Sequence, residues 1–252
     1  MNSPAPARPA PRPRTMPSPE SEFYVWQPES GAKSADPAGG ARPAPRARSS
    51  TEALLIVLSA PSGGGKTTLC RQLLAARLNV TRAVTCTTRE PRPGEREGVD
   101  YYFLDAGSFL KRVQAGNFLE HATVYGNSYG TLKAEVLDKL RQGRDVLLAI
   151  DVQGAAAIRK QAEVDQELRR ALVTVFLTPA SLEVLEDRLK KRGQDSPAAI
   201  QKRLSVARQE VAQWKHFDYL IPSSSIEEDL RRMLAILDAE KMRQCRAPAP
   251  EM

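Results

Sequence analysis

Nearly continuous aliphatic runs recur along the chain from residue 54 onward, separated by polar segments that often contain glycine. Strands buried on both faces of a sheet carry such runs, because neither face meets water. The three strongest runs lie at residues 54–60, 145–151 and 172–178. Shorter strands are predicted at residues 82–89, 101–104, 118–125 and 219–223.

Helices are predicted between these strands, where apolar residues recur every three or four positions. Glycines end several of them, and Pro179 suits the first turn of a helix that Thr178 would cap. The predicted helices cover residues 66–76, 108–115, 132–141, 179–193, 197–213 and 226–237. Strands that alternate with helices indicate an α/β fold in which helices cover both faces of a parallel sheet.

Residues 1–50 differ from the rest of the chain, because they hold 11 of the 19 prolines and few aliphatic residues. Such a segment cannot bury enough apolar area to offset its ordering entropy, so disorder is predicted. The aromatic residues at 23–26 allow two interpretations, packing onto the neighbouring domain or a short docking motif. Translation from Met16 would leave part of this extension out.

The composition is that of an ordinary globular protein, with 41% hydrophobic and 27% charged residues. No apolar run approaches the ~20 residues of a membrane helix, and no secretory signal is present, so no membrane partner is expected. The three cysteines lack pair spacing, and the two histidines lie far apart. A reducing, cytoplasmic location is therefore expected, without disulfides or a histidine–cysteine metal centre.

The net charge favours a small polyanionic ligand over nucleic acid. The formal charge is +7, and residues 1–50 contribute +3 of it (seven basic minus four acidic residues). The remaining +4 is a weak basis for binding a nucleic-acid backbone. We therefore expect no specific nucleic-acid partner; binding that depends on the extension and falls steeply with salt would indicate the contrary.

A glycine-rich turn at residues 59–68 (SAPSGGGKTT) joins the first buried strand to the first helix. In such a turn, backbone N–H groups and the positive end of the helix dipole face phosphate oxygens. Lys66 is expected to reach the β- and γ-phosphates of ATP, and Thr67 to give its hydroxyl to Mg²⁺. A plain glycine-rich linker, the alternative, leaves the flanking strand and helix unexplained. The candidate ATP-binding residues are Ala60, Pro61, Ser62, Gly63, Gly64, Gly65, Lys66, Thr67 and Thr68.

Two residues near this turn qualify the prediction. Ala60 stands where the general pattern of such loops has glycine, and alanine tolerates the position if its φ is negative. Asp151 ends the run 145–151, at the sheet edge where ligands bind in open parallel sheets. A carboxylate that assists the metal is expected at such a strand end, so Asp151 is a candidate to hold Mg²⁺ through water.

A second anion site is predicted at residues 85–102 (TCTTREPRPGEREGVDYY). Arg89 and Arg92 stand three apart between stiffening prolines, and arginine forks grip phosphate oxygens bidentately. Four acidic residues interrupt the basic ones, which favours one compact phosphate over a nucleic-acid surface. Candidate neutral donors nearby are Tyr101, Tyr102 and Tyr129.

Six motifs occur together in the order in which guanylate kinases have them. They are SAPSGGGKTT (59–68), TTREPRPGE (87–95), GVDYYF (98–103), FLEHATVYGNSYGT (118–131), IDVQG (150–154) and RLKKRGQDS (188–196). The chain therefore closely resembles the guanylate kinase family over residues 54–243, leaving the N-terminal extension outside. Enzymes of this family move phosphate from ATP to GMP, so the resemblance implies ATP and GMP as partners, Mg²⁺ as cofactor and dGMP as a further acceptor.

The resemblance also implies the architecture, a P-loop nucleoside monophosphate kinase fold at residues 51–246 with a short tail at 247–252. Its parallel core would comprise residues 51–84, 145–178 and 214–246. A small mixed GMP-binding subdomain is implied at about 85–130 and a helical lid at about 186–204. The implied reaction is in-line phosphoryl transfer without a covalent enzyme intermediate, and the oligomeric state, a homo-oligomer included, stays open.

Roles for single residues follow from the resemblance in the same way. Glu120 in FLEH matches the guanine reader; guanine presents N1–H and an amino group as adjacent donors, which a carboxylate accepts as a pair. The grip on the GMP phosphate matches Arg89, Arg92, Tyr101 and Tyr129. Positions near the base match Thr85, Gly130, Thr131 and Asp151. The lid over the ATP phosphates matches Arg188, Arg192 and Arg203, which with Lys66 and Arg89 form the implied catalytic set.

The chain departs from the family pattern at two positions. The family usually has DID where this chain has Ala149-Ile150-Asp151, so the first carboxylate is missing and Asp151 is left to do more of the work. Ser223 follows Pro222 where the family often offers asparagine to adenine, which weakens the inference on the adenine contacts alone. Ala60 is no departure, because family members carry glycine or alanine there.

Two other functions compete with that of a kinase for GMP. Guanylate-kinase-like domains in scaffold proteins bind phosphopeptides without turnover, but those usually have a damaged phosphate loop, and GGGKT is intact here. A related kinase for a ribosyl phosphate would have no use for a guanine-reading Glu120 together with Tyr101 and Tyr129. A kinase acting on GMP is therefore predicted.

Overall fold

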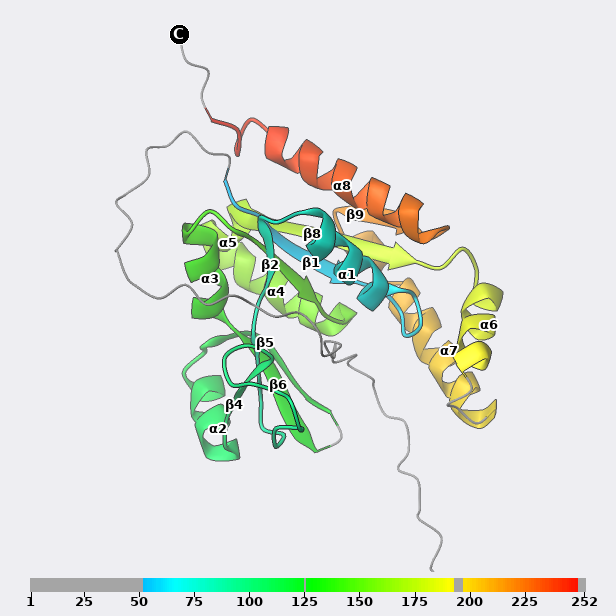
Figure 1. The fold of residues 1–252 in the computed structure, drawn as a ribbon, viewed down its shortest axis with the longest axis horizontal. Helices are drawn as coiled ribbons and strands as arrows, with labels where there is room; N and C mark the ends of the chain where they lie inside the picture. The colour runs from blue at the N-terminus through cyan, green and yellow to red at the C-terminus, as the bar shows by residue number, and fades with distance from the viewer. Residues whose placement is uncertain (1–51, 125, 193–196, 249–252) are drawn as a thin grey trace, which may run out of the picture.

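The computed structural model describes residues 52–124, 126–192 and 197–248. The predicted disordered extension and its aromatic residues at 23–26 lie outside the described residues. Figure 1 displays two sheets, with one pair of helices, α6 and α7, projecting from the end of the larger sheet. Within the described ranges, no helix combines the length and apolar character needed to cross a membrane.

Five parallel strands form the core sheet in the order β2-β7-β1-β8-β9. Their bounds are β1 (Leu55–Ser59), β2 (Val80–Arg82), β7 (Asp145–Ala149), β8 (Leu172–Thr178) and β9 (Tyr219–Pro222). Leu55 of β1 pairs with Val146 of β7 on one side and with Leu172 of β8 on the other. All five residues of β1 are buried, so the first aliphatic run is confirmed as a central strand.

Side chains of the central strand alternate between two hydrophobic layers, as the period of a strand requires. Leu54, Ile56 and Leu58 pack with helices α1 and α8. Leu55 and Val57 pack on the opposite face with helices α3, α4 and α5. The bounds of these helices are α1 (Lys66–Ala76), α3 (Lys133–Arg141), α4 (Val152–Val164), α5 (Gln166–Ala171) and α8 (Ile226–Met242). The predicted parallel sheet with helices on both faces is confirmed.

A second, mixed sheet of four strands has the order β4-β3-β6-β5. Its elements are β3 (Thr85–Thr87), β4 (Tyr101–Phe103), β5 (Phe118–Val124) and β6 (Asn127–Leu132), and helix α2 (Ala106–Gln114) packs beside them. Phe109 of α2 stacks on Phe118 of β5 with the ring centroids 4.6 Å apart, over buried Cys86. Figure 1 places this small sheet below the core sheet.

The prediction of one strand at residues 82–89 is wrong. The structure has β2 in the core sheet and β3 in the mixed sheet, with Ala83 and Val84 between them. Arg82 pairs with Leu147 of the core, whereas Thr85 pairs with Tyr101 and Thr131 of the mixed sheet. The sequence shows no break in this run because both of its halves form strands. The chain crosses from the core sheet to the mixed sheet between the two halves.

Four other elements differ from the prediction. Strand β6 and helices α4 and α5 were not predicted, since β6 is polar and α4 buries mainly small residues such as Ala155 and Ala162. Helix α6 begins at Leu182, not at Pro179, and Ser181 Oγ accepts the Val184 N–H at 3.3 Å. Thr178 cannot cap this helix because it still belongs to β8 and pairs with Pro222.

Helices α6 (Leu182–Arg192) and α7 (Pro197–Val211) pack together and end in a short 3-10 helix, η1 (Trp214–His216). Their contact is a small apolar cluster of Leu185, Leu189, Ile200, Leu204 and Ala207. The cluster is separate from the two layers of the core. This pair therefore carries its own interior, apart from the two layers of the core.

An ionic cluster fastens the last helix to the start of the core sheet. Asp145 Oδ1 accepts the Leu54 N–H at 2.7 Å and pairs with Lys241 Nζ at 2.6 Å. Glu240 is 1% exposed, pairs with Arg246 and accepts the Tyr219 hydroxyl at 2.5 Å. Because these contacts lie at the amino ends of the strands, they leave the carboxyl edge of the sheet to the candidate site.

Candidate functional site

The glycine-rich turn runs from the end of β1 to the first residue of α1. Gly63 and Gly65 have φ of +81° and +97°, which favour glycine, and Gly65 is the N-cap of α1. A Cβ on Gly64 would lie 2.9 Å from the Pro61 carbonyl oxygen and 3.1 Å from the Ala60 Cβ. The alanine therefore fits inside the turn, 2% exposed, and the glycine opposite it provides the room.

Lys66, the first residue of α1, reaches across to the end of β7. Its Nζ donates to the Ile150 carbonyl oxygen at 3.1 Å. Burial lowers the pKa of Lys66, against the attraction of Asp151 and Glu210. The ammonium group is thus held at the junction of the turn and the sheet edge, where phosphate oxygens would meet it.

Asp151 follows β7 and caps α4 by accepting the Gly154 N–H at 2.8 Å. Burial raises the pKa of Asp151, although that hydrogen bond and the Lys66 charge oppose the rise. Ala149, the predicted departure, is exposed at the end of β7. A carboxyl group with a raised pKa at this edge would be stabilised in its ionised form by a cation.

The residues at the glycine-rich turn and the end of β7 fit a magnesium ion that takes most of its ligands from nucleotide phosphates. The Thr67 hydroxyl and the Asp151 carboxylate are hard oxygen donors, which magnesium prefers. In the described part of the chain, no group of three or more His, Cys, Asp or Glu side chains could hold a metal. A metal at this edge would therefore need phosphate oxygens among its ligands.

Glu210, near the end of α7, also lies at the turn, and no sequence pattern indicated it. Its Oε2 accepts the Ser62 N–H at 3.3 Å, across 148 residues of sequence. Burial raises the pKa of Glu210, while the Ser62 N–H and Lys66 oppose the rise. A carboxylate thus faces a backbone donor of the turn, as a phosphate oxygen would.

Arg188 of α6 is brought to the same turn. Its Nη1 lies 3.9 Å from the place that a Cβ on Gly65 would take, and a Cβ on Gly63 would lie 3.0 Å from Leu185. The turn therefore packs directly on α6. Arg203 is half-buried on α7, and the side chain of Arg192 lies outside the described residues.

Glu120 lies in the mixed sheet, 6% exposed, in β5. Its Oε1 accepts the Thr131 hydroxyl of β6 at 2.6 Å, and Thr131 pairs across the sheet with Thr85 of β3. Burial raises the pKa of Glu120 to about 7, against the Thr131 hydrogen bond. The predicted set Thr85, Glu120 and Thr131 is thus contiguous on three neighbouring strands.

Gly130, also predicted, closes the space between β5 and β6. A Cβ there would lie 2.9 Å from the Phe118 ring and 3.1 Å from the Glu120 carbonyl oxygen. The two strands can approach each other only because this position has no side chain. The position of the Glu120 carboxylate therefore depends on Gly130.

The predicted phosphate grip is partly assembled around Tyr101. Arg89 lies over its ring, with Cζ 5.5 Å from the centroid, and the Tyr129 ring meets the Tyr101 ring edge-on with the centroids 6.4 Å apart. Glu95, which no sequence pattern indicated, accepts hydrogen bonds from Arg89 Nη2 on both carboxylate oxygens, at 2.8 and 3.0 Å. Arg92 is exposed, and its N–H donates to Glu95 Oε2 at 2.8 Å.

The Tyr101 hydroxyl is a buried polar atom with no hydrogen-bond partner among the described residues, on a side chain that is 2% exposed. Such an atom costs free energy unless a ligand or water satisfies it. Tyr102, the other candidate donor, points elsewhere and donates to Glu135 Oε2 at 3.1 Å. Of the two, only Tyr101 has a free donor to offer to a phosphate.

Electrostatics join the two halves of the site. After burial and the Thr131 hydrogen bond, the charge of Asp151 is the next influence on Glu120, and it also raises the Glu120 pKa. Asp151 in turn interacts with Lys66 at the glycine-rich turn. The buried carboxylate of the mixed sheet therefore lies within electrostatic reach of the carboxyl edge of the core sheet.

Ser223, the second predicted departure, is occupied by a structural contact. Its hydroxyl donates to Asp229 Oδ2 at 2.7 Å, and the Ser224 N–H donates to the other oxygen at 3.0 Å. These bonds tie β9 to the start of α8. Nothing in the structure directs Ser223 toward a base.

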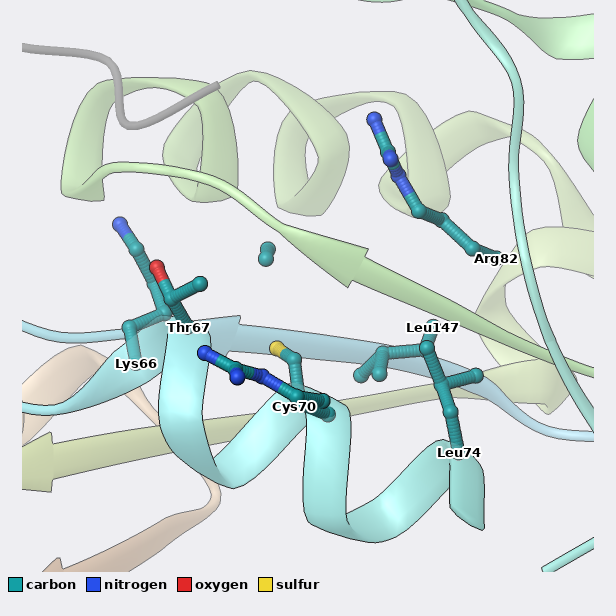
Figure 2. A pocket seen from close by; sticks show the side chains of 8 residues that line it. Lys66, Thr67, Cys70, Leu74, Arg82 and Leu147 are labelled. Atoms are coloured by element: carbon teal, nitrogen blue, oxygen red, sulfur yellow. The ribbon is translucent and has the colours of Figure 1, made fainter. Parts of the chain in front are cut away.

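Figure 2 gives a close view of a pocket between α1 and β7. The pocket is lined by Lys66, Thr67, Cys70, Arg71, Leu74, Arg82, Leu147 and Ala149. Burial raises the pKa of the Cys70 thiol to about 12, so it stays neutral. The pocket adjoins the glycine-rich turn of residues 59–68 (the phosphate turn) through Lys66 and Thr67.

A glycine-rich turn that leads a buried parallel strand into a helix, with lysine and threonine at the helix start, defines a P-loop nucleotide-binding protein. The mixed sheet adds a second site with a buried carboxylate and an arginine–tyrosine cluster. Residues 52–240 match the model of the "Guanylate kinase" family. The chain belongs to the guanylate kinase family.

Related proteins align with the same region. A guanylate kinase of Coxiella burnetii is 45% identical over 193 residues, which cover 77% of this chain and 90% of that one. One of Maricaulis maris is 42% identical over 206 residues, 82% of this chain and 92% of that one. The crystal structure of guanylate kinase from Anaplasma phagocytophilum is 34% identical, with a TM-score of 0.60, covering 79% of this chain and 92% of that one.

Proposed function

We propose that the protein transfers the terminal phosphoryl group of ATP to GMP, and to dGMP, to give the diphosphate. The observation that carries this proposal is the buried Glu120 carboxylate, which is next to Thr131 and within electrostatic reach of Asp151 beside the phosphate turn. A base reader and a phosphate turn that face each other suit two nucleotides bound with their phosphates adjacent. Family membership supports the same conclusion.

Selection of guanine follows from the chemistry of Glu120. Its ionised carboxylate would accept both N1–H and N2–H of guanine, while the Thr131 hydroxyl keeps its own bond to Oε1. Adenine offers an acceptor at N1 and would leave the buried carboxylate unpaired. Discrimination of about 10⁴-fold is typical when a site built for hydrogen bonding meets an analogue that lacks them.

The acceptor phosphate is proposed to bind at Tyr101, Tyr129 and Arg89, with Arg92 closing from the exposed turn. The unsatisfied Tyr101 hydroxyl supplies a donor, and Glu95 holds the Arg89 guanidinium over the ring. An arginine that is oriented in advance loses less side-chain entropy when the ligand arrives. Thr85 and Gly130 would border the base.

The chemical step is proposed to be an in-line displacement at the γ-phosphorus. The attacking oxygen belongs to the GMP phosphate and is already anionic, so no general base is needed. Lys66, Arg188, Arg192 and Arg203 would stabilise the charge that spreads over the transferred group, and Arg89 would hold the two anions together. Magnesium, held by Thr67 and through water by Asp151, would neutralise further phosphate charge.

Helices α6 and α7 are proposed to act as the lid over the ATP phosphates. Their separate apolar cluster and their direct packing on the turn, through Leu185 and Arg188, support this role. Closure would exclude water, which otherwise competes as phosphoryl acceptor. We place the reaction in purine nucleotide metabolism in the cytoplasm, in keeping with free thiols at Cys70, Cys86 and Cys245.

A coupled assay for ADP release, with GMP, dGMP, AMP and ribose phosphates as acceptors, tests the proposal. GMP and dGMP are expected to support turnover, and AMP to be poorer by about 10⁴-fold in kcat/KM. Turnover with a ribose phosphate above that with GMP would reassign the acceptor. Binding of GMP without any ADP release would instead support a non-catalytic interaction module.

A further inference from the structure

The pocket in Figure 2 places an arginine opposite the phosphate turn. Arg82 ends β2 and pairs in register with Leu147 of β7, and Ala149 stands two residues further along β7. In parallel strands, partners in register and residues two apart point to the same face. Arg82, Leu147 and Ala149 therefore share the face that α1 covers, and Figure 2 has Arg82 across the pocket from Lys66.

The charges around the pocket have one sign. Among the eight described residues that line it, three are cations (Lys66, Arg71 and Arg82) and none is a carboxylate. A carboxylate at 149 would stand on the same face as Arg82, diagonally across two adjacent strands, within reach of a long side chain. The alanine at this position leaves the pocket with a net positive charge beside Lys66 and Thr67.

Arg82 also lies close to the acceptor side, because Thr85, three residues further along the chain, pairs with Tyr101 of the mixed sheet. Burial raises the pKa of the Tyr101 hydroxyl, and Arg82 is the foremost of the charges that oppose this rise, ahead of Arg89. Arg82 likewise opposes the raised pKa of Cys70 in the pocket. Its backbone is fixed, because the Arg82 carbonyl oxygen accepts Lys139 Nζ at 2.8 Å. One guanidinium group is thus within electrostatic reach of both the pocket and the unsatisfied Tyr101 hydroxyl.

We propose that Arg82 is a further binding residue for the phosphate group of the acceptor nucleotide, and that Ala149 keeps its charge directed at that phosphate. The ligand is a nucleoside monophosphate dianion, approached by Arg89 from the mixed sheet and by Arg82 from the core sheet. The inference rests on the proposed function, since it assigns a residue to the same acceptor.

The test compares Arg82→Met, which removes the charge at similar length, with Arg82→Lys, which keeps it, in the full chain. Loss of one charge-assisted contact should raise KM for GMP by about tenfold in Arg82→Met, with little change in KM for ATP. Arg82→Lys should recover most of the affinity. Calorimetric titration of GMP gives the same comparison without turnover.

Arg71→Met is the matched control, because Arg71 lines the same pocket but is exposed on α1. An equal rise in KM for GMP in Arg71→Met would indicate a diffuse potential and overturn the assignment. Unchanged GMP affinity in Arg82→Met would also overturn it. Wild-type turnover of GMP in that same experiment would leave the proposed function standing, whereas its absence would refute the function itself.

The role of Ala149 is tested by a double-mutant cycle. Ala149→Asp should weaken GMP binding in the wild-type background, because the new carboxylate draws the Arg82 charge away from the phosphate. The same substitution in the Arg82→Met background should lose that effect. An effect of equal size in both backgrounds would show that residue 149 acts independently of Arg82. Thermal unfolding of each variant, with wild-type-like melting, confirms that the fold is kept.

Discussion

Burial of Glu120 destabilises the ionised form of its carboxyl group, and a ligand that donates hydrogen bonds to the carboxylate would offset this effect. Its pKa of about 7 means that the empty protein holds a proton there more tightly than the unfolded chain does. The folded state therefore loses stability as the pH rises through about 7 and the carboxylate forms. Guanine would supply the two donors that the ionised group lacks.

This residue gives GMP binding a defined pH dependence. Only the ionised carboxylate accepts from guanine, so KM for GMP is expected to rise about tenfold from pH 8 to pH 6, as the proton occupies a growing share of Glu120. KM for ATP should stay nearly constant. Steady-state kinetics across this range measures both constants.

Glu120→Gln is the control for that profile. The amide should raise KM for GMP sharply at every pH, and what pH dependence it retains reports the titration of the GMP phosphate. If the variant keeps the wild-type preference for GMP over AMP, Glu120 does not read the base.

Lys66→Ala is expected to abolish turnover, with kcat at least about 10³-fold lower, while GMP still binds. The reason is that Nζ lies 3.1 Å from the Ile150 carbonyl oxygen at the edge of the core sheet, whereas the proposed GMP contacts belong to the mixed sheet. Single-turnover kinetics and calorimetry separate the two effects. Lys160→Ala, exposed on α4, serves as control, and a near-normal kcat in Lys66→Ala would remove this residue from the chemistry.

Single residues were predictable where a local pattern carried them. The turn with Lys66 is recognisable because its glycines, lysine and threonine are consecutive in the sequence. Glu120 stands in an apolar stretch, where an unpaired charge would be costly, and this indicates a functional role. Glu210 could not be found in this way, since its contact with Ser62 spans 148 residues. Glu95 lies within the arginine segment, yet acidic residues there suggested only a break in positive charge.

Among the elements, the buried strands of the core and β4 and β5 of the mixed sheet were predictable from the sequence, whereas β6 was not. Strands β1, β7 and β8 are recognisable by their nearly continuous aliphatic residues, because helices cover both faces of the core sheet. β6 has the sequence NSYGTL, and what makes it a strand is pairing with β3 and β5. Pairing partners far apart in sequence leave no periodic signal in the strand itself.

The pairing of β6 with β5 can be tested at Gly130, where the two strands approach each other closely. Gly130→Ala is expected to push β6 from β5, because the Cβ would meet the Phe118 ring at 2.9 Å and the Glu120 carbonyl at 3.1 Å. The melting temperature should fall and KM for GMP should rise about tenfold, since overpacking of this kind costs about 1–3 kcal/mol. Thermal unfolding and GMP kinetics test it together.

Gly107→Ala in α2 is the matched control, because its only close atom is the Asp105 side chain at 3.1 Å. It should leave KM for GMP within about twofold, since alanine is favoured inside a helix. A Gly130→Ala variant with wild-type kinetics would show that the strand spacing does not set the Glu120 position.

For the whole molecule, the ionic cluster at the amino edge should govern stability without touching the chemistry. Lys241→Met leaves Asp145, 8% exposed in its side chain, without its cation, and should lower the free energy of unfolding by about 3 kcal/mol. KM for GMP and ATP should not change, because the cluster lies at the opposite edge from the phosphate turn. Urea denaturation and steady-state kinetics measure the two parts.

Arg77→Met provides the comparison. Arg77 pairs with Asp238 at 2.5 Å, but the two side chains are 42% and 56% exposed. A pair so open to solvent is worth roughly 0.5 kcal/mol, so the loss should be small. Equal losses in the two variants would mean that burial of Asp145 does not strengthen the Lys241 contact.

The same cluster has a consequence for how the chain is made. Leu54 directly precedes the central strand, yet the lysine that pairs with its partner Asp145 is residue 241, 187 positions later. At about 5–20 residues per second, a ribosome needs roughly 10–40 s to bridge that gap. During this interval the nascent chain exposes its first aliphatic strand without α8 to cover it. Pausing on the codons just before α8 should therefore lower the soluble yield, although it alters no contact of the finished protein.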